Sequence, residues 1–352
     1  MVINKYKELS CVMPVYNSGK WLFESLPRLI DSLKEANITK VEIIVVDDGS
    51  TDGSTDGILN IPCPYKIKII KQKNSGRFLA RKKGIDESKY RNVLLIDSRV
   101  LIDKGSISYI FNSKINSKQM QVWNGHVNID KEGNIFARFW DALVLIAWRR
   151  YFSNPRECSY GLADFDYYPK GTGCFLVPKK IIVKAIDAFL LQTTDLRNSS
   201  DDTLLIRIIA TNNNINLSPE FSCTYYSRNT FKKYIAHAHV RGRLFVDGFL
   251  RPGNRFFVPL IVFLSLCLFV PVLLVLQPHL LGPSIILLIV LWLIELTVSL
   301  ILIGIKDALS LWILSPIFAI AYGLGIIISS FRIASRLFRG YIAGLNANNP
   351  NK

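Results

Sequence analysis

Residues 41–52 read VEIIVVDDGSTD, a mostly apolar run followed at once by two carboxylates, a glycine and two hydroxyl residues. The apolar part, residues 41–46, predicts a strand buried on both faces, as in a parallel sheet covered by helices. In such sheets ligands bind at the carboxyl ends of the strands. The polar residues from Asp47 onward are therefore the first candidates for a binding site.

The chain on either side of this stretch alternates strand and helix patterns. Strand-like runs fall at residues 9–15, 65–70 and 93–96, and helical patterns fall at residues 21–36 and 77–88. This alternation is typical of an α/β domain with a parallel, doubly covered sheet. We expect that domain to cover residues 1–227.

Asp47 and Asp48 are candidates for binding a nucleoside. A carboxylate only accepts hydrogen bonds, so it pairs with donors such as the N3–H of uracil and the hydroxyl groups of ribose. The alternative is that these residues only begin a helix, because Asp and Ser are common N-cap residues. Residues 50–54 could provide the cap while Asp47 and Asp48 face the ligand.

Polar residues also follow the other predicted strands. The first strand ends in Pro14-Val15-Tyr16-Asn17, the third leads to Asn74-Ser75-Gly76-Arg77, and the fourth delivers Asp97-Ser98-Arg99. A helix that begins after Gly76 would turn its N-terminus and Arg81 toward the nucleotide, because helix N-termini bind phosphate groups. In an extended segment, Asp97 and Arg99 would point to the same side.

In this order and spacing, the motifs P-V-Y-N, V-D-D-G-S-T-D, N-x-G-x-x-x-A-R and the aspartate after the fourth strand resemble the family 2 glycosyltransferases. The resemblance extends over residues 9–243 and implies the GT-A fold, a Rossmann-like α/β domain of nucleotide-diphospho-sugar transferases. It implies a hexosyltransferase-type enzyme that takes a sugar from a UDP-sugar and inverts the anomeric centre. The nucleotide-binding positions that it implies are Pro14, Tyr16, Asp47, Asp48, Gly76 and Arg81.

Two later segments continue the resemblance. Residues 170–177, KGTGCFLV, are similar to the glycine-containing strand on the acceptor side of the family, which points to Gly173. Residues 200–207, SDDTLLIR, are similar to the family's E-D-x-x-L-x-x-R segment, which implies that Asp202 is the catalytic base and that Asp201 replaces the usual Glu. The alternative is that both acids simply stabilise the first turn of a helix.

The chain departs from the family at its metal motif, Asp-x-Asp, because the third position is Arg99. Mg²⁺ or Mn²⁺ prefers hard oxygen ligands, and arginine offers none. Either Asp97 holds the metal together with the donor phosphates, or Arg99 itself clamps the diphosphate with its planar fork. The sequence thus predicts a weakened dependence on metal.

Hydrophobic residues make up 50% of the chain and charged residues 20%, and the two kinds are segregated. Apolar stretches at residues 256–276, 284–304 and 311–331 each have roughly 20 residues, enough to cross about 30 Å of hydrocarbon. We expect a transmembrane block of about three helices over residues 254–331, followed by a basic tail at 332–352. The preceding segment, 228–253, combines apolar and basic residues at helical spacing. It predicts a helix in the membrane interface, one packed on the catalytic domain, or both.

Two short motifs narrow the resemblance. Residues 240–243, VRGR, and 322–325, YGLG, are similar to membrane-attached transferases of succinoglycan and other exopolysaccharide biosynthesis. This similarity implies a lipid-linked acceptor at the membrane, and Arg241 and Arg243 would attract its phosphate.

The location follows from charge and cysteine usage. The net charge of +16 favours anionic partners, but the basic residues are scattered and show no nucleic-acid-binding motif, so no nucleic acid is expected. The six cysteines never form C-x-x-C, which is typical of free thiols in a reducing compartment. The first residues contain no signal-peptide pattern. We therefore expect a multi-pass protein of the cell membrane with its catalytic domain in the cytoplasm.

The tail raises a topological conflict. Arg332, Arg336, Arg339 and Lys352 favour a cytoplasmic tail by the positive-inside rule, whereas three full spans would place it outside. The third apolar stretch, which contains Pro316, Gly323 and Gly325, is the one we expect to be re-entrant or interfacial if the rule holds.

Other functions remain open from the sequence. A polyprenyl-phosphate glycosyltransferase would use the same domain with a phosphate as acceptor. A non-catalytic scaffold that binds nucleotide sugars is favoured by Arg99 in the metal motif. A processive synthase is disfavoured, because the Q-x-x-R-W motif typical of such enzymes is absent from the sequence.

Overall fold

The computed structural model describes residues 7–116, 120–192, 196, 201–250 and 252–347. They fall into two compact units. Unit 1 comprises the chain up to Glu132 together with Ala147–Ser227, and unit 2 comprises Gly133–Ile146 together with the chain from Arg228 onward.

Unit 1 is built on one mixed sheet with the order β3-β2-β1-β4-β8-β6-β9-β5, and β7 pairs with β9. The strands are β1 (Glu8–Val15), β2 (Lys40–Asp47), β3 (Lys66–Lys71), β4 (Asn92–Ile96), β5 (Val100–Ile102), β6 (Val122–Ile129), β7 (Cys158–Tyr160), β8 (Cys174–Pro178) and β9 (Ile215–Tyr225). The first four strands are parallel and match the predicted runs to within one residue at each end. Strand β8 is antiparallel to both β4 and β6, so the second half of the sheet is not the parallel continuation that the alternation predicted.

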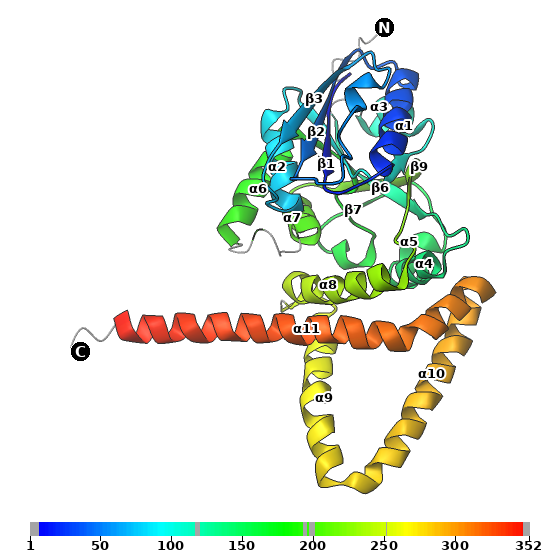
Figure 1. The fold of residues 1–352 in the computed structure, drawn as a ribbon, viewed down its shortest axis with the longest axis vertical. Helices are drawn as coiled ribbons and strands as arrows, with labels where there is room; N and C mark the ends of the chain where they lie inside the picture. Colours follow the sequence, from blue (N-terminus) through cyan, green and yellow to red (C-terminus); the bar gives the residue numbers. More distant parts are fainter. Residues whose placement is uncertain (1–6, 117–119, 193–195, 197–200, 251, 348–352) are drawn as a thin grey trace. The chain divides into compact units, whose positions relative to one another are not determined.

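Helices cover both faces of this sheet, as the buried strands predicted (Figure 1). The helices of unit 1 are α1 (Trp21–Glu35), α2 (Arg77–Glu87), α3 (Ser106–Asn112), α5 (Arg149–Phe152), α6 (Lys179–Gln192) and α7 (Asp201–Ala210). Cys11 and Met13 of β1 pack in the cluster that contains α1 and α3, whereas Val12 packs in the cluster that contains α2, α6 and α7. Neighbouring residues of a strand point to opposite faces, so these two clusters are the two sides of one core layer.

Helix α2 lies very close to β1 and β2. A Cβ built on Gly84 would lie 2.3 Å from Cγ1 of Val12 and 3.2 Å from Cγ2 of Val46. The shorter distance is below any normal carbon–carbon contact, so a larger residue would push α2 away from the sheet. This close packing fixes the first turns of α2, with Arg77 and Arg81, at the carboxyl ends of the strands.

Unit 2 contains α4 (Ile135–Ala147), α8 (Phe231–Phe249), α9 (Phe257–Leu276), α10 (Leu281–Ile303) and α11 (Ile305–Ala347). Residues 133–146 lie within the predicted domain of residues 1–227 but belong to unit 2. The physical reason is the aromatic face of α4. Phe139 packs with Tyr234 of α8 and Leu314 of α11, and the hydroxyl of Tyr234 donates a hydrogen bond to the carbonyl of Leu314 at 3.2 Å.

Helices α8 and α11 run alongside each other (Figure 1) and touch backbone to backbone. A Cβ on Gly242 of α8 would lie 2.1 Å from the carbonyl oxygen of Tyr322, and a Cβ on Gly325 of α11 would lie 2.2 Å from the carbonyl oxygen of His239. Small residues of this kind let helices approach closely. The VRGR and YGLG motifs, which the sequence presented as separate, therefore form one helix crossing.

Three helices of the described residues are long and apolar enough to cross a membrane, over Phe257–Leu276, Pro278–Ile303 and Ile305–Ser335. The third departs from the prediction in two ways. The third apolar stretch was predicted to begin at residue 311, but α11 begins at Ile305 and also contains Lys306 and Asp307, and Asp307 accepts a 2.9 Å hydrogen bond from Arg138 of α4. The helix also continues through Pro316 and past residue 331 without the chain reversal of a re-entrant loop.

Candidate active site

Most of the predicted site residues meet at one edge of the unit 1 sheet. The carboxyl ends of β1, β2, β3 and β4 share this edge because these strands are parallel. Strand β8 runs the other way, so its beginning lies there too, and the amide of Asp97 donates a 2.9 Å hydrogen bond to the carbonyl of Gly173. The motifs that follow β1, β2, β3 and β4 and the glycine segment before β8 are therefore neighbours.

The loops after β1 and β2 are joined by hydrogen bonds. The amide of Asn17 donates to Oγ of Ser50 at 3.1 Å, and Oδ1 of Asn17 accepts from the amide of Thr51 at 2.8 Å. The amide of Gly19 donates to Oδ2 of Asp52 at 2.9 Å. Burial acts to raise the pKa of Asp52, but hydrogen bonds from Ser54 and Gly19 outweigh it and lower the pKa. The P-V-Y-N and D-D-G-S-T-D motifs thus form a single scaffold.

Two residues of the first motif differ in what they offer a ligand. Pro14 lies within β1 opposite Val46 of β2, where it shapes the sheet. The Tyr16 side chain is 54% exposed and so is open to contact from solution. Asn17, which adopts a left-handed φ of 46°, turns the chain directly after it.

Asp47 and Asp48 are only 4% exposed, and both organise loops. Asp47 accepts from the amide of Ser50 and from Oγ1 of Thr55, each at 2.8 Å. Asp48 accepts from Nε2 of Gln72 and from the backbone amides of Ser75 and Gly76 at 2.8, 2.8 and 2.9 Å. These bonds tie the end of β2 to the loop that leads into α2. The part of both carboxylates in nucleotide binding stays a prediction.

Gly49 makes this arrangement possible. Its φ is 79°, and a Cβ at this position would lie 2.9 Å from the amide nitrogen of Asn74. The backbone after β2 therefore passes directly against the backbone after β3, and only glycine combines that conformation with that proximity.

Helix α2 holds two of the predicted functional carboxylates with two arginines. Nη2 of Arg81 donates to Oδ1 of Asp97 at 2.7 Å, and Nη2 of Arg77 donates to Oδ1 of Asp202 at 2.7 Å. Residues four apart share one face of a helix, so α2 presents both guanidinium groups together. Arg81 was assigned to the nucleotide from the sequence, whereas Arg77 was given no role. The four-residue spacing of Arg77 from Arg81 was the available clue to its place on the same helix face.

The segment after β4 is not extended, so the prediction that Asp97 and Arg99 point to the same side is wrong. The amide of Val100 donates to the carbonyl of Asp97 at 2.9 Å, which closes a tight turn. Asp97 consequently meets Arg81, while the guanidinium carbon of Arg99 lies 5.8 Å from the ring centroid of Trp21. The role of Arg99 toward a diphosphate remains a prediction.

Arg99 belongs to an aromatic group that sequence reasoning missed. The ring of Trp21, at the start of α1, lies 4.7 Å from the ring of Tyr226, and the amide of Tyr226 donates to the carbonyl of Arg99 at 3.3 Å. A guanidinium near an aromatic face gains cation–π attraction. Tyr226 follows β9, far from Trp21 along the chain, and no local pattern links the two.

The acceptor-side residues that the sequence singled out also lie in unit 1. A Cβ on Gly173 would lie 3.4 Å from Oδ2 of Asp97, so this glycine keeps the space beside that carboxylate open. Arg207, the arginine at the end of the SDDTLLIR segment, donates to Oδ1 of Asp166 at 2.5 Å and fixes the loop that contains Asp166 to α7. Asp201 begins α7, and its side chain lies outside the described part of the structure.

Arg241 and Arg243 lie on α8, in unit 2. Arg241 is exposed and its Nε donates to Nε2 of His237 at 3.3 Å, whereas Arg243 is partly buried. Gly242 between them is the residue that makes the contact with α11. The two charges were predicted from the sequence, but the packing role of Gly242 was not.

The metal-ligating side chains of the described residues do not form a divalent-metal site by themselves. Within the described residues, no group of three or more His, Cys, Asp or Glu side chains comes together to hold an ion. Asp97 is the one carboxylate that follows β4 directly, and Arg81 already binds it. Mg²⁺ or Mn²⁺ would need most of its oxygen ligands from elsewhere, such as phosphate groups.

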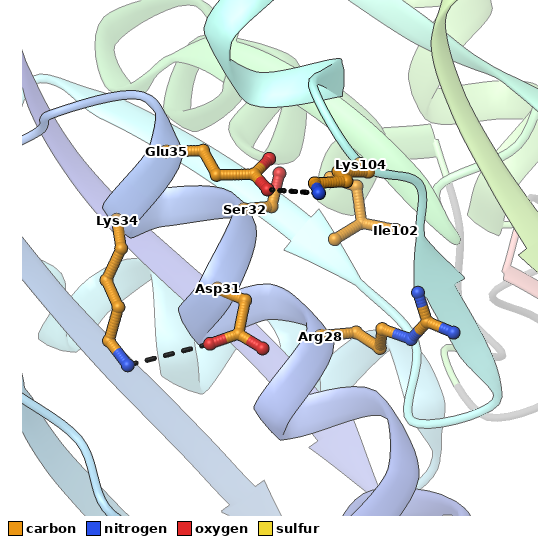
Figure 2. Close-up of a pocket in the computed structure, with 7 residues that line it drawn as sticks. All are labelled: Arg28, Asp31, Ser32, Lys34, Glu35, Ile102 and Lys104. Atoms are coloured by element: carbon orange, nitrogen blue, oxygen red, sulfur yellow. Dashed lines mark ion pairs between the residues drawn. The ribbon is translucent and has the colours of Figure 1, made fainter.

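A pocket of about 410 Å³ lies beside α1 (Figure 2). It is lined by Arg28, Asp31, Ser32, Lys34, Glu35, Ile102 and Lys104. Its charges form two loose ion pairs, Lys34–Asp31 at 3.5 Å and Lys104–Glu35 at 3.7 Å. None of the motif residues contributes to it, and we assign it no function.

Comparisons with known proteins agree with the sequence motifs. Residues 10–157 match the profile of the family described as Glycosyl transferase family 2. Glycosyltransferase GlyG of Streptococcus pneumoniae is 27% identical over 133 residues, which cover 36% of this chain and 42% of that protein. The undecaprenyl-phosphate 4-deoxy-4-formamido-L-arabinose transferase of Proteus mirabilis is 34% identical over 97 residues, which cover 27% of this chain and 29% of that protein.

Among solved structures, the crystal structure of S. aureus TarS 1-349 in complex with UDP-GlcNAc is similar to 69% of this chain, and 68% of that chain is covered. The sequence identity is 14% and the TM-score is 0.47. The match to each of the two curated relatives spans less than half of their own length.

Proposed function

The chain carries a glycosyl transferase family 2 domain at residues 10–157, and from this premise we propose that it is an inverting glycosyltransferase. It moves a sugar from a nucleotide sugar, by our inference a UDP-sugar, to a lipid-linked or saccharide acceptor at a membrane. The observation that carries the proposal is the edge of the sheet where α2 holds Asp97 and Asp202 through Arg81 and Arg77. A helix N-terminus with two guanidinium groups suits a diphosphate, and a carboxylate beside it suits a base.

In the reaction, Asp202 accepts the proton of the acceptor hydroxyl as its oxygen attacks the anomeric carbon. The bond from that carbon to the diphosphate oxygen breaks, and the nucleoside diphosphate leaves with the electron pair. General-base assistance of this kind contributes about 10²–10⁴-fold in rate. Fixed cations at the leaving group act as preorganised electrostatic stabilisation, and Arg77, Arg81 and Arg99 are the candidates.

We infer that the nucleoside lies against the joined loops after β1 and β2, where Tyr16 is exposed. Gly173 leaves room beside Asp97, on the side where the resemblance puts the acceptor. A divalent cation, if bound, would supply positive charge to the diphosphate. Asp97 would be its one protein ligand among the proposed site residues.

The apolar helices of unit 2 support a membrane location for the acceptor. A lipid-linked acceptor is confined to the bilayer, and attaching the enzyme there raises the effective concentration of one for the other. Arg241, exposed on α8, and Arg243 would attract the phosphate groups of such a lipid. We place the catalytic unit in the cytoplasm, where nucleotide sugars are made, and infer polysaccharide or glycolipid biosynthesis as the process.

A second candidate is transfer to a polyprenyl phosphate. It is favoured by the 34% identity to the Proteus mirabilis undecaprenyl-phosphate transferase. A phosphate acceptor is already ionised and needs little help from a base. The Asp202→Asn variant distinguishes the two functions, because transfer to a hydroxyl should be lost and transfer to a phosphate largely kept.

The test is release of nucleoside diphosphate from a panel of nucleotide sugars, measured on membranes that contain the wild type, Asp202→Asn or Asp86→Asn. Asp86 is a matched control, because it is an ion-paired acid on α2 that bonds Lys82 at 2.6 Å. We expect Asp202→Asn to lose at least 100-fold in turnover while UDP binding survives, and Asp86→Asn to behave as wild type. UDP binding without any release by the wild type would contradict catalysis and support a scaffold.

A further inference from the structure

Helices α8 and α11 run parallel to each other over most of the length of α8. Near the beginning of α8, Tyr234 packs in one cluster with Leu314 of α11. Near the end of α8, Val246 packs in another cluster with Ile326. Both helices advance in the same direction from the first cluster to the second, so the apolar part of α11, residues 311–331, lies alongside α8 (Figure 1).

Helix α8 is too strongly charged to lie in hydrocarbon. Lys232, Lys233 and Arg241 are all exposed on it. If α11 crossed a bilayer, α8 would lie at the same depth beside it. Arg241 would then come near the middle of the bilayer, because its neighbour Gly242 lies against the backbone of Tyr322, halfway along the apolar part of α11. A charged side chain at that depth is strongly unfavourable, so this packing argues against a crossing by α11.

The surface of α11 that unit 2 leaves uncovered is a single apolar stripe. Its exposed large side chains recur three, four or seven positions apart and include Ile313, Ile320, Leu324, Ile328 and Phe331, which we call the α11 stripe. This spacing places them on one face of the helix. A helix with one exposed apolar face, packed beside a basic helix, fits the plane of a membrane interface.

Helices α9 and α10 differ from α11 in how little of them is covered. Only 6% of the apolar stretch of each is buried within the protein, against 33% for α11. The connection between them, residues 277–280, contains no Lys, Arg, Asp or Glu. By the positive-inside rule, a connection without basic residues suits the outer face of the membrane. These two helices therefore fit a hairpin that crosses the bilayer and returns.

We propose that α11 lies in the plane of the cytoplasmic membrane interface beside α8, and that only α9 and α10 cross the bilayer. The partner of the α11 stripe is the lipid layer itself. The stripe enters the boundary between headgroups and acyl chains to a depth of about 5–10 Å, and the exposed basic residues of α8 lie among anionic headgroups. The tail then stays on the cytoplasmic side, as its basic residues favour.

This inference goes beyond the transfer reaction and rests on one part of the proposed function, the attachment to a membrane. Two other partners for the stripe are the acyl chains around a full span and a second copy of the chain. Depth separates the first from an in-plane helix. Positions 320 and 331 would differ in depth by about 16 Å if α11 crossed upright, but they lie at nearly the same depth if it does not.

Helix α10 offers a matched control for this comparison. Leu293, near its middle, and Ile301, near its end, are both exposed apolar residues. Because α10 crosses the bilayer in the proposal, these two positions should differ in depth by about 12 Å. The same measurement on α10 and α11 therefore has one expected gradient and one expected plateau.

The experiment measures the depth of a nitroxide side chain by electron paramagnetic resonance, as its accessibility to lipid-soluble oxygen relative to a water-soluble nickel chelate. A nitroxide amino acid is introduced into the full-length protein by stop-codon suppression, which leaves the native cysteines in place. The protein is reconstituted into vesicles of phosphatidylcholine and phosphatidylglycerol. We expect positions 320 and 331 to agree in depth to within about 5 Å, and positions 293 and 301 to differ by about 12 Å.

A depth difference of about 16 Å between positions 320 and 331 would overturn the in-plane placement and leave membrane attachment intact. Low accessibility to both reagents at these positions would also overturn it, because the stripe would then be covered by protein, such as a second copy. If the labels on α10 meet the nickel chelate as freely as in water, membrane attachment fails and the inference falls with it. Positions 313 and 324 of the stripe replace any position whose label alters the circular dichroism.

Discussion

Replacing Gly242 by alanine should destabilise unit 2 by an amount that the geometry sets. The added Cβ would lie 2.1 Å from the carbonyl oxygen of Tyr322, 2.9 Å from its carbonyl carbon and 3.1 Å from its Cα. Carbon–oxygen contacts between helices normally begin near 3.3 Å, so α8 and α11 would have to separate by roughly 1 Å. All three obstacles belong to the backbone and cannot rotate aside.

The expected cost follows from two opposing effects. Overpacking of this kind costs about 1–3 kcal/mol, and glycine to alanine in a helix returns up to about 1 kcal/mol through propensity. We expect a net loss of about 1–2 kcal/mol, or a fall of roughly 2–8 °C in the apparent melting temperature of a unit of this size. Gly325→Ala should behave alike, because its Cβ would lie 2.2 Å from the carbonyl oxygen of His239.

The assay is thermal unfolding of the detergent-solubilised protein, followed by tryptophan fluorescence. Trp292 and Trp312 stack at 4.3 Å between α10 and α11 and report on unit 2. Gly282→Ala in α10 is the matched control, because a Cβ there has no atom within 4 Å. Equal melting temperatures for Gly242→Ala and Gly282→Ala would refute the reasoning that the crossing requires glycine.

Three further outcomes are expected. The turnover of Arg99→Asp should depend more strongly on Mn²⁺ than that of the wild type, measured after chelation and titration of the metal. If the wild type is already inactive without metal and the variant is more active, Arg99 does not bind the diphosphate. Burial lowers the pKa of His126 in the folded state. The unfolded chain therefore binds the proton first as the pH falls, and the free energy of unfolding should decrease below about pH 6.5. In denaturant titrations at several pH values, the free energy of unfolding of His126→Gln should depend less on pH. A cysteine at position 332 should react with an impermeant maleimide added outside intact cells if all three apolar helices cross, and remain protected if the positive-inside rule decides.

The sequence was most informative where structure is set locally. Strands β1 to β4 and helices α1 and α2 matched their predicted bounds closely, because near-continuous apolar runs and helical periodicity depend on neighbouring residues. The bond between Arg77 and Asp202 joins residues 125 positions apart and has no local pattern. Its formation depends on the close seating of α2 on the sheet at Gly84, which is a property of the packed core.

Two predictions from the sequence differ from the structure for the same physical reason. An apolar helix such as α4 reads the same whether it packs on a sheet or on other helices, and only the contacts of Phe139 with Tyr234 and Leu314 assign it to unit 2. The turn at Asp97 is likewise not visible in the local composition, because the hydrogen bond from Tyr226 to Arg99 that accompanies it comes from the end of β9. Contacts with distant residues therefore give Asp97–Arg99 a turn, whereas the prediction assumed an extended segment in which side chains alternate.

The charges at the edge of the sheet offer a physical reason for Arg99. Compared with the second acid of the family motif, Arg99 adds two positive charges to this edge, the charge of one divalent cation. A more positive edge attracts a diphosphate with less help from a metal ion. Arg99 lies over Trp21 rather than beside Asp97, so its charge acts through the field of the whole edge, and this placement also keeps it from occupying the carboxylate. On this reasoning the arginine and the metal are alternative sources of the same charge, and restoring the acid should restore the requirement for the ion.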